Sequence, residues 1–178
     1  MAVTVYFLRH ASAGERVENP AKDAKRALDA IGMEQAVRMG AALAAWGAQL
    51  DAIVSSPLKR CTQTAALVAN EIGHVRPIET ATALRPEATF AEFQQLLRAH
   101  AGREAILLVG HNPLLSECLG KVLGDSVRPA RIQLRRGALA KVDFKRGAGY
   151  LHWLLPPKLL LKSWVEARAR RTPTHARR

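Results

Sequence analysis

The chain has 178 residues, of which 48% are hydrophobic and 24% charged, and this predicts one globular domain with a substantial core. Its formal net charge of +12 is typical of a protein that attracts anions. No run of about 18 apolar residues is present, which excludes a membrane-spanning helix, and the two cysteines, Cys61 and Cys118, exclude a disulfide framework.

The positive charge is concentrated near the C-terminus. Residues 158–178 hold seven Lys or Arg against one acid, Glu166, which is half of the net charge. The sequence therefore predicts a domain over residues 1–157 and a basic C-terminal helix and tail over 158–178. The chain begins directly on a strand pattern, without the basic and small-residue segments of a secretory signal, so we expect a cytoplasmic protein. We also expect a monomer.

The first predicted element is a buried strand that is followed at once by two basic residues. Residues Val3–Leu8 are apolar or β-branched, and Arg9 and His10 follow at once. Ligands of open α/β sheets bind beyond the carboxyl ends of the strands. Arg9 and His10 are therefore expected to lie in a site.

A long connection and two helices surround the next predicted strand. Residues 11–29 are polar and long enough to predict a functional loop. Apolar residues at helical spacing, beginning with Ile31 and Met33, predict a helix that ends near Gly47. Residues 51–55 are a short buried strand. Pro57 is then expected in the first turn of a helix that is capped by Ser55 or Ser56 and stops at residue 73.

Strands and helices also alternate in the rest of the chain. Strands are predicted at 75–80, 105–109, 138–144 and 150–155, and helices at 90–100 and 114–123. This alternation predicts an α/β fold, a three-layer sandwich in which helices cover both faces of a mainly parallel central sheet. The last two strands are expected to form a hairpin.

Basic side chains follow three of the predicted strands. They are Arg9 and His10 after the first, Arg60 after the second, and His111 after the strand at 105–109. Guanidinium groups match phosphate oxygens, and the helix N-termini nearby add N–H donors, so this set predicts a phosphoryl-group site. No cluster of acids and no Cys or His at ligand spacing accompanies it, so we expect no metal and no other cofactor.

Three motifs in the same order resemble the histidine phosphatase superfamily, whose fold is phosphoglycerate-mutase-like. The motifs are Leu8-Arg9-His10-Ala11, Ser55-Ser56-Pro57-Leu58-Lys59-Arg60-Cys61-Thr62-Gln63-Thr64-Ala65 and Gly110-His111-Asn112-Pro113. Arg-His-Ala at the first motif, together with the segment Asp23–Leu28, is similar to the short SixA-type phosphohistidine phosphatases. The resemblance covers about residues 3–155.

This resemblance implies a catalytic role for each matching residue. His10 would be the nucleophile and carry the phosphoryl group as phosphohistidine, which water then hydrolyses. Arg9, Arg60 and His111 would bind the phosphate oxygens and stabilise the transition state. The two arginines should also keep His10 neutral, whereas His111 would act best as a cation beside a bound phosphate.

The general acid of the sugar-phosphate members has no clear counterpart here. Where they carry a Leu-x-Glu pattern, this chain has Leu84-Arg85-Pro86-Glu87, with Glu87 displaced by one position. An acid matters less when the leaving group is an imidazole than when it is an alkoxide. The expected activity is therefore hydrolysis of phosphohistidine on a protein such as a phosphotransfer domain. The alternative is a small-molecule phosphatase for sugar or nucleotide phosphate esters, with Glu87 as the acid.

The basic C-terminus leaves one further class of function open. Residues 158–178 could be an arm that binds nucleic acid or an anionic membrane surface. The favoured interpretation is a terminal helix that packs Leu159, Leu160 and Trp164 on the domain, followed by solvated arginines. We therefore expect neither membrane nor nucleic-acid partners.

Overall fold

The structure is a computed structural model, and it describes residues 3–124, 128–145 and 148–160. Within these residues six strands form one sheet of order β3-β2-β4-β1-β5-β6. Four of them run parallel: β1 (Val3–Arg9), β2 (Ala52–Ser55), β3 (Glu79–Thr80) and β4 (Ala105–Gly110). The antiparallel hairpin beside β1 consists of β5 (Leu139–Lys145) and β6 (Ala148–Leu155).

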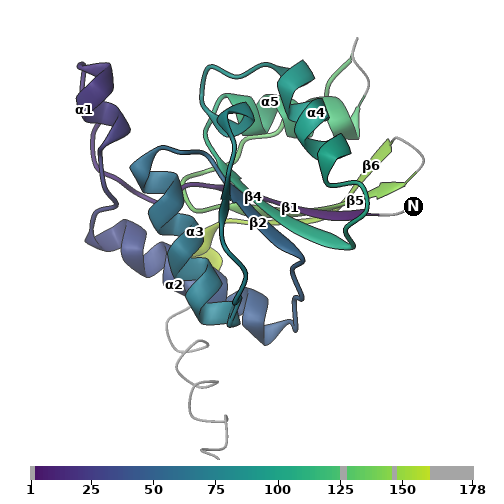
Figure 1. Ribbon diagram of the computed structural model, residues 1–178, viewed down its shortest axis with the longest axis horizontal. Coiled ribbons are helices and arrows are strands. Elements are labelled where there is room, and N and C mark those ends of the chain that lie inside the picture. Colours follow the sequence, from purple (N-terminus) through teal and green to yellow (C-terminus); the bar gives the residue numbers. More distant parts are fainter. Residues whose placement is uncertain (1–2, 125–127, 146–147, 161–178) are drawn as a thin grey trace, which may run out of the picture.

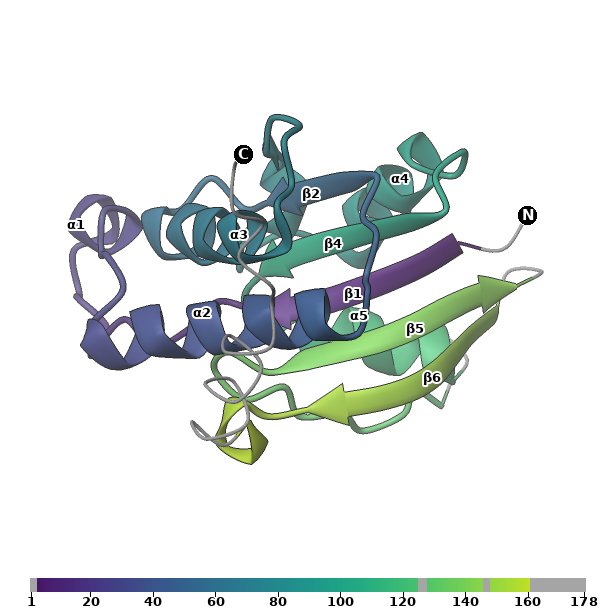
Figure 2. The same ribbon diagram turned by 90° about the horizontal axis from the view of Figure 1, so that it is seen from below.

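Helices cover both faces of this sheet, as Figures 1 and 2 show. The helices α2 (Ala30–Ala45) and α3 (Lys59–Ile72) lie on one face, and α4 (Phe90–Ala99) and α5 (Leu114–Leu123) lie on the other. The short helix α1 (Pro20–Ala24) lies beyond the end of the sheet, and 3₁₀ turns occur at Thr82–Leu84 and Pro157–Leu159. The predicted three-layer α/β sandwich with a mainly parallel sheet is confirmed.

The side chains of β1 point alternately to the two faces of the sheet, and they enter the two layers of the core. Val5 and Phe7 pack with the α4–α5 side, where the rings of Phe7 and Phe93 are 5.7 Å apart. Tyr6 and Leu8 pack with α2 and α3. Because successive strand residues face opposite sides, a strand buried on both faces has a continuous apolar sequence. The same rule explains why the strand at 105–109 could be predicted.

Several predicted boundaries are confirmed and others are wrong. Gly73 adopts a left-handed φ of 66° and ends α3, as expected. Pro57, however, precedes α3 rather than opening it, and no side chain caps this helix. The hydroxyls expected to cap it have other contacts, because Ser55 Oγ donates to the Ser56 carbonyl and Ser56 Oγ contacts His111.

Four apolar residues lie on the solvent side, contrary to expectation. Ile31 and Met33 are exposed at the start of α2, because the first turn of this helix extends past the edge of the core. The predicted strand at 75–80 is reduced to two residues, and Val75 is exposed, since Pro77 has no N–H for pairing. Leu159 is also exposed, whereas Leu160 is buried among the residues of α2 and α3.

The predicted C-terminal helix lies mostly outside the described residues, as does Trp164. Both cysteines are free and buried, as predicted. None of the described helices has the length and apolar character needed to cross a membrane.

Candidate active site

The candidate site lies at the carboxyl ends of the central strands. Arg9 ends β1 and pairs in register with Gly110, the last residue of β4. The backbone N–H of His10 donates to the Gly110 carbonyl at 2.9 Å. Ser56 follows β2, and its N–H donates to the Val109 carbonyl at 2.9 Å. Three parallel strands therefore bring His10, Ser56 and His111 together, although they are far apart in sequence.

His10 is held as a neutral imidazole with a defined tautomer. Its Nδ1 lies 2.8 Å from the carbonyl oxygen of Ala11, which can only accept, so Nδ1 carries the proton. The Nε2 lone pair is therefore free to act as a nucleophile. Burial is the main cause that lowers the pKa of His10 to about 3. The Ala11 carbonyl opposes this shift, and the charges of Arg60 and Arg9 add to it.

His111 lies against His10, with ring centroids 5.0 Å apart. Its Nε2 is 2.9 Å from Ser56 Oγ and 3.2 Å from Cys61 Sγ, and the ring is 1% exposed. Burial first, and then the charges around it, lower the pKa of His111 to about 2. The ring is thus neutral at neutral pH. A bound phosphate dianion would raise this pKa, so the cationic role expected of His111 stays a prediction for the phosphate complex.

Arg9 and Arg60 supply the positive charge of the site. Arg60 lies in the first turn of α3 and is 4% exposed, and its Nη1 donates to the Asp23 carbonyl at 2.9 Å. Nη1 of Arg9 donates to the carbonyl of Leu134 at 3.0 Å. Only three buried side-chain nitrogen or oxygen atoms lack a partner among the described residues, and the Nε atoms of these two arginines are two of them.

These unpaired donors indicate an anion site. Buried N–H groups in proteins are normally hydrogen-bonded, because an unpaired one loses the solvation it had in water. Two of the three exceptions belong to the arginines that flank the histidine pair, and the third, His74 Nε2, lies outside the site. A phosphoryl group bound beside the two guanidinium groups would offset their positive charges and accept hydrogen bonds from their N–H donors.

Sequence reasoning missed the acid that holds Arg60. Asp23, in α1, places Oδ2 3.2 Å from Arg60 Nη1 and Oδ1 2.8 Å from Arg26 Nε. Arg26 in turn donates to the Ala13 carbonyl at 2.8 Å. The i, i+3 spacing of Asp23 and Arg26 was a visible signal for such a pair. The loop at 11–29 therefore folds back on the site, as its length suggested.

Glu87 is not part of this cluster. Its carboxylate pairs with the neighbouring Arg85, and 61% of its side chain is exposed. The structure thus brings together Arg9, His10, Arg60 and His111, and places the candidate acid in solvent. In the described part of the chain, no three His, Cys, Asp or Glu residues are grouped as metal ligands.

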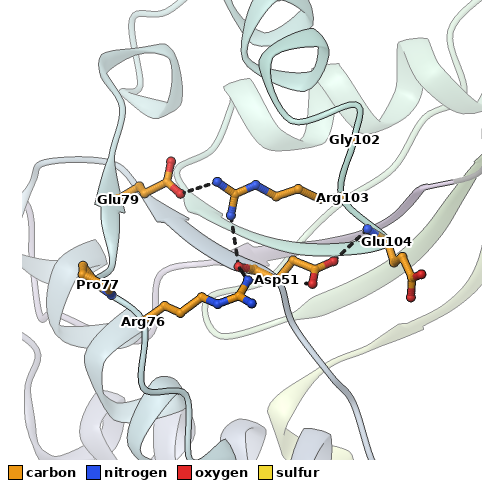
Figure 3. Close-up of a pocket in the computed structure, with 7 residues that line it drawn as sticks. All are labelled: Asp51, Arg76, Pro77, Glu79, Gly102, Arg103 and Glu104. Carbon is orange, nitrogen blue, oxygen red and sulfur yellow. Dashed lines mark hydrogen bonds and ion pairs between the residues drawn. The ribbon is translucent and has the colours of Figure 1, made fainter.

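A separate cavity of about 680 Å³ lies at the opposite end of the sheet (Figure 3). It includes Asp51 and Glu104, which immediately precede β2 and β4. Arg103 donates to Glu79 at 2.9 Å and to the Asp51 carbonyl at 3.0 Å, and Figure 3 shows these contacts. Its acids, Asp51, Glu79 and Glu104, outnumber its two arginines, so this cavity has no excess positive charge to attract an anion.

The sequence model of the histidine phosphatase superfamily (branch 1) matches residues 5–96. The chain belongs to this superfamily. The match includes Arg9, His10 and Arg60, and the geometry adds His111, which follows β4. Membership supports a phosphatase, a hydrolase of phosphoryl groups. Comparison with curated protein sequences found no match.

Solved structures share the whole fold. The protein histidine phosphatase SixA in complex with tungstate is 22% identical, with a TM-score of 0.78 over 89% of this chain and 100% of that one. A protein assigned as the phosphohistidine phosphatase SixA of Agrobacterium tumefaciens is 25% identical, with a TM-score of 0.74 over 87% and 98%. A protein assigned as an α-ribazole-5′-phosphate phosphatase of Escherichia coli is 18% identical, with a TM-score of 0.71 over 87% and 98%. These identities establish a shared fold but not a shared substrate.

Proposed function

We propose that this chain hydrolyses phosphohistidine on proteins through a phosphorylated His10, without a metal. The observation that supports it most is the neutral histidine pair flanked by two arginines with unpaired buried N–H donors. This arrangement has a nucleophile with a free lone pair and donors for the charge on phosphorus. The likeness to SixA structures is consistent with the phosphohistidine substrate.

In the first step His10 Nε2 attacks phosphorus in line with the substrate's P–N bond. That bond breaks, and its electron pair stays on the leaving imidazole, which departs neutral when its other ring nitrogen is protonated. Phospho-His10 keeps its proton on Nδ1, where the Ala11 carbonyl stabilises the positive ring. Arg9 and Arg60 bind the oxygens of the transferring group.

In the second step water attacks the phosphoryl group of phospho-His10. The new P–O bond forms as the bond to Nε2 breaks, and the pair returns to Nε2. The water's proton passes to the departing phosphate, so neutral His10 is restored. Neither step consumes a cofactor.

The nature of the leaving group favours phosphohistidine over an ester. An alkoxide needs a proton from a general acid, and such an acid contributes about 10²- to 10⁴-fold to the rate. Glu87 is exposed and paired with Arg85. The site's own carboxylate is Asp23, and although partial burial opposes the shift, hydrogen bonds and the charges of Arg60 and Arg26 hold its pKa below the usual value. An ionised carboxylate is a poor proton donor, whereas imidazole needs none.

The second candidate is a small-molecule phosphate monoesterase, and the α-ribazole-5′-phosphate phosphatase among the structural neighbours favours it. In this alternative Glu87 leaves Arg85 and reaches the substrate as the general acid. The two candidates therefore predict different effects of removing Glu87.

One comparison separates the two candidates. Rates of Glu87→Gln are measured on a phosphohistidine peptide and on an alkyl phosphate, with Glu34→Gln as the control, because Glu34 also forms an exposed pair, with Arg38. We expect the phosphohistidine rate to stay within about twofold. A loss of about 10²-fold or more on both substrates would show that the phosphohistidine proposal is wrong.

The nucleophile and the absence of a metal are tested together. His10→Ala should lower turnover by several orders of magnitude, and the wild type should form an acid-labile phosphoenzyme that this variant does not. Activity should be the same with and without EDTA. Unchanged activity in His10→Ala, or loss of activity in EDTA, would contradict the mechanism.

A further inference from the structure

The segment between α5 and β5 carries a dense positive charge next to the site. Residues 128–136 contain four arginines and no acid. The side chains of Arg131, Arg135 and Arg136 are exposed, and none of the three forms an ion pair within the described residues. The phosphoryl-transfer steps above use none of these three arginines.

Leu134 fixes this segment to the catalytic strands. Its side chain is fully buried, and its carbonyl accepts hydrogen bonds from Arg9 Nη1 at 3.0 Å and from Asn112 Nδ2 at 2.8 Å. Its N–H donates to Ser116 Oγ at 3.1 Å. The residue before Asn112 is His111, so Leu134 is bound beside two of the proposed phosphate ligands.

Gly137 fixes the other end of the segment. Its N–H lies 3.1 Å from the carbonyls of both Arg9 and His10. It adopts a left-handed φ of 71°, and a Cβ there would lie 2.9 Å from Pro157 Cγ, so only glycine fits without strain. Arg135 and Arg136 are therefore held between two anchors that both bind the strand carrying the nucleophile.

Two open cavities lie on either side of this segment. The first, of about 440 Å³, is lined by Arg9, Arg135, Arg136 and Lys158 with no acid among its lining residues. The second, of about 1070 Å³, is lined on its charged side by Lys121, Arg128, Arg131 and the acid Glu117. Gln133 lines both. In contrast to Arg76 and Arg103 of the cavity in Figure 3, which pair with acids, Arg131, Arg135 and Arg136 line these cavities without an ion pair within the described residues.

We propose that residues 128–136 form a docking surface for the acidic face of a phosphohistidine-bearing protein. The proposal rests on the function proposed above and names the kind of partner. Arg131 lines one cavity, and Arg135 and Arg136 line the other. Their charge therefore covers a wider surface than one small phosphate ester requires. Asp and Glu side chains around the phosphohistidine would pair with Arg131, Arg135 and Arg136 while the phosphoryl group reaches His10. Complementary charge of this kind raises the rate of encounter and orients the partner.

The test uses two phosphohistidine peptides of equal length, one with Asp and Glu around the phosphohistidine and one with Asn and Gln. At about 50 mM salt we expect the wild type to show a kcat/KM about tenfold higher on the acidic peptide. The advantage should disappear at about 500 mM salt, where exposed charges are screened. The triple variant R131Q/R135Q/R136Q should lose this preference for the acidic peptide at low salt. It should still hydrolyse phosphoramidate at the wild-type rate.

The matched control removes three charges from the other end of the molecule. R76Q/R98Q/K145Q changes residues near the amino ends of β3 and β4 and at the carboxyl end of the antiparallel β5. This control should keep the preference for the acidic peptide. The reversed variant R131E/R135E/R136E should instead prefer a Lys-flanked peptide.

The outcomes separate the two proposals. Equal rates on both peptides in the wild type would overturn the docking surface and leave the phosphohistidine function intact. If the control variant R76Q/R98Q/K145Q lost the preference equally, the preference would reflect only the net charge of the protein. That result would also overturn the docking surface. Cleavage of phosphoramidate with no hydrolysis of either peptide would overturn the function and the docking surface together. A triple variant that instead loses phosphoramidate turnover would place these arginines in a small-anion subsite, contrary to the proposal.

Discussion

At the level of single residues, burial has the largest effect on the charge state of the site. It is the first cause of the low pKa of both His10 and His111, ahead of the nearby arginines. A neutral imidazole avoids the cost of a buried cation and keeps the Nε2 lone pair of His10 available. The same burial makes the stability of the fold depend on pH.

The pH dependence has a definite sign. In the unfolded chain these histidines titrate near 6.5, and in the folded chain near 3 and 2, so below pH 6.5 the unfolded state binds more protons. Stability is therefore fully present above about pH 6.5 and is lost as the pH falls. Between about pH 7.5 and about pH 5, each histidine should lower the free energy of unfolding by about 2 kcal/mol.

Chemical denaturation at several pH values in this window tests that prediction. The double variant His10→Gln/His111→Gln should show a clearly smaller decline of stability with pH than the wild type. An identical decline in both proteins would mean that the two imidazoles are not buried in the neutral form.

Asp23 is the residue whose removal should reveal how Arg60 is positioned. Its carbonyl and carboxylate both bind Arg60 Nη1, and only the carboxylate is lost in Asp23→Ala. A misplaced guanidinium would lower kcat on phosphoramidate by about 10- to 100-fold, while KM changes less. Asp143→Ala is the control, because Asp143 is also part-buried and paired but lies on β5 near the start of β1. Equal losses in the two variants would indicate general destabilisation instead.

At the level of elements, the regular part of the fold could be predicted and its ends could not. The strands at 3–8 and 105–109 are buried on both faces, so their apolar runs identify them without any tertiary information. The start of α3 could not be predicted, because Ser56 has the residue type of a helix cap but contacts His111 from a neighbouring strand. Ile31 has helical spacing, yet it is exposed in the first turn of α2.

The site could be predicted where the chain itself places residues at strand ends. Arg9 ends a strand, His10 and His111 directly follow strands, and Arg60 lies in the first turn of the next helix. Asp23 and Leu134 could not be found this way, because each acts through contacts with residues more than 30 positions away. Such long-range contacts leave no periodic pattern in the sequence.

The packing of α2 on the loop after β1 gives a prediction at this level. A Cβ on Gly32 would lie 1.8 Å from the backbone oxygen of Ser12, two residues after His10. Gly32→Ala should therefore push this loop away, lower the free energy of unfolding by about 1–3 kcal/mol and reduce turnover. Gly102→Ala meets nothing within 4 Å and should behave as the wild type. Thermal unfolding and phosphoramidate kinetics measure both effects, and a fully active, equally stable Gly32→Ala would contradict the close contact.

For the whole molecule, charge differs between the two ends of the sheet. At the amino ends of the strands, Arg76 and Arg103 pair with Asp51 and Glu79. At the carboxyl ends, residues 128–136 and the site arginines hold a surplus of positive charge. An anionic substrate is therefore attracted to the end that contains His10, and this attraction should weaken with salt.

The basic C-terminus is the remaining source of charge, and its role provides the last prediction. Leu160 is buried against α2 and α3, and its carbonyl accepts a hydrogen bond from Arg38 at 3.5 Å, so the chain is packed on the domain up to this point. The arginines beyond it have no part in the proposed chemistry. Deleting residues 172–178 should therefore leave the midpoint of thermal unfolding and the turnover of phosphoramidate unchanged.

The intact chain should also bind duplex DNA and anionic vesicles only weakly at about 150 mM salt, because a few terminal arginines without a recognition element give salt-sensitive, non-specific contacts. Tight binding to either probe that disappears with the deletion would show that the C-terminus is a binding arm and that catalysis is not the chain's only function.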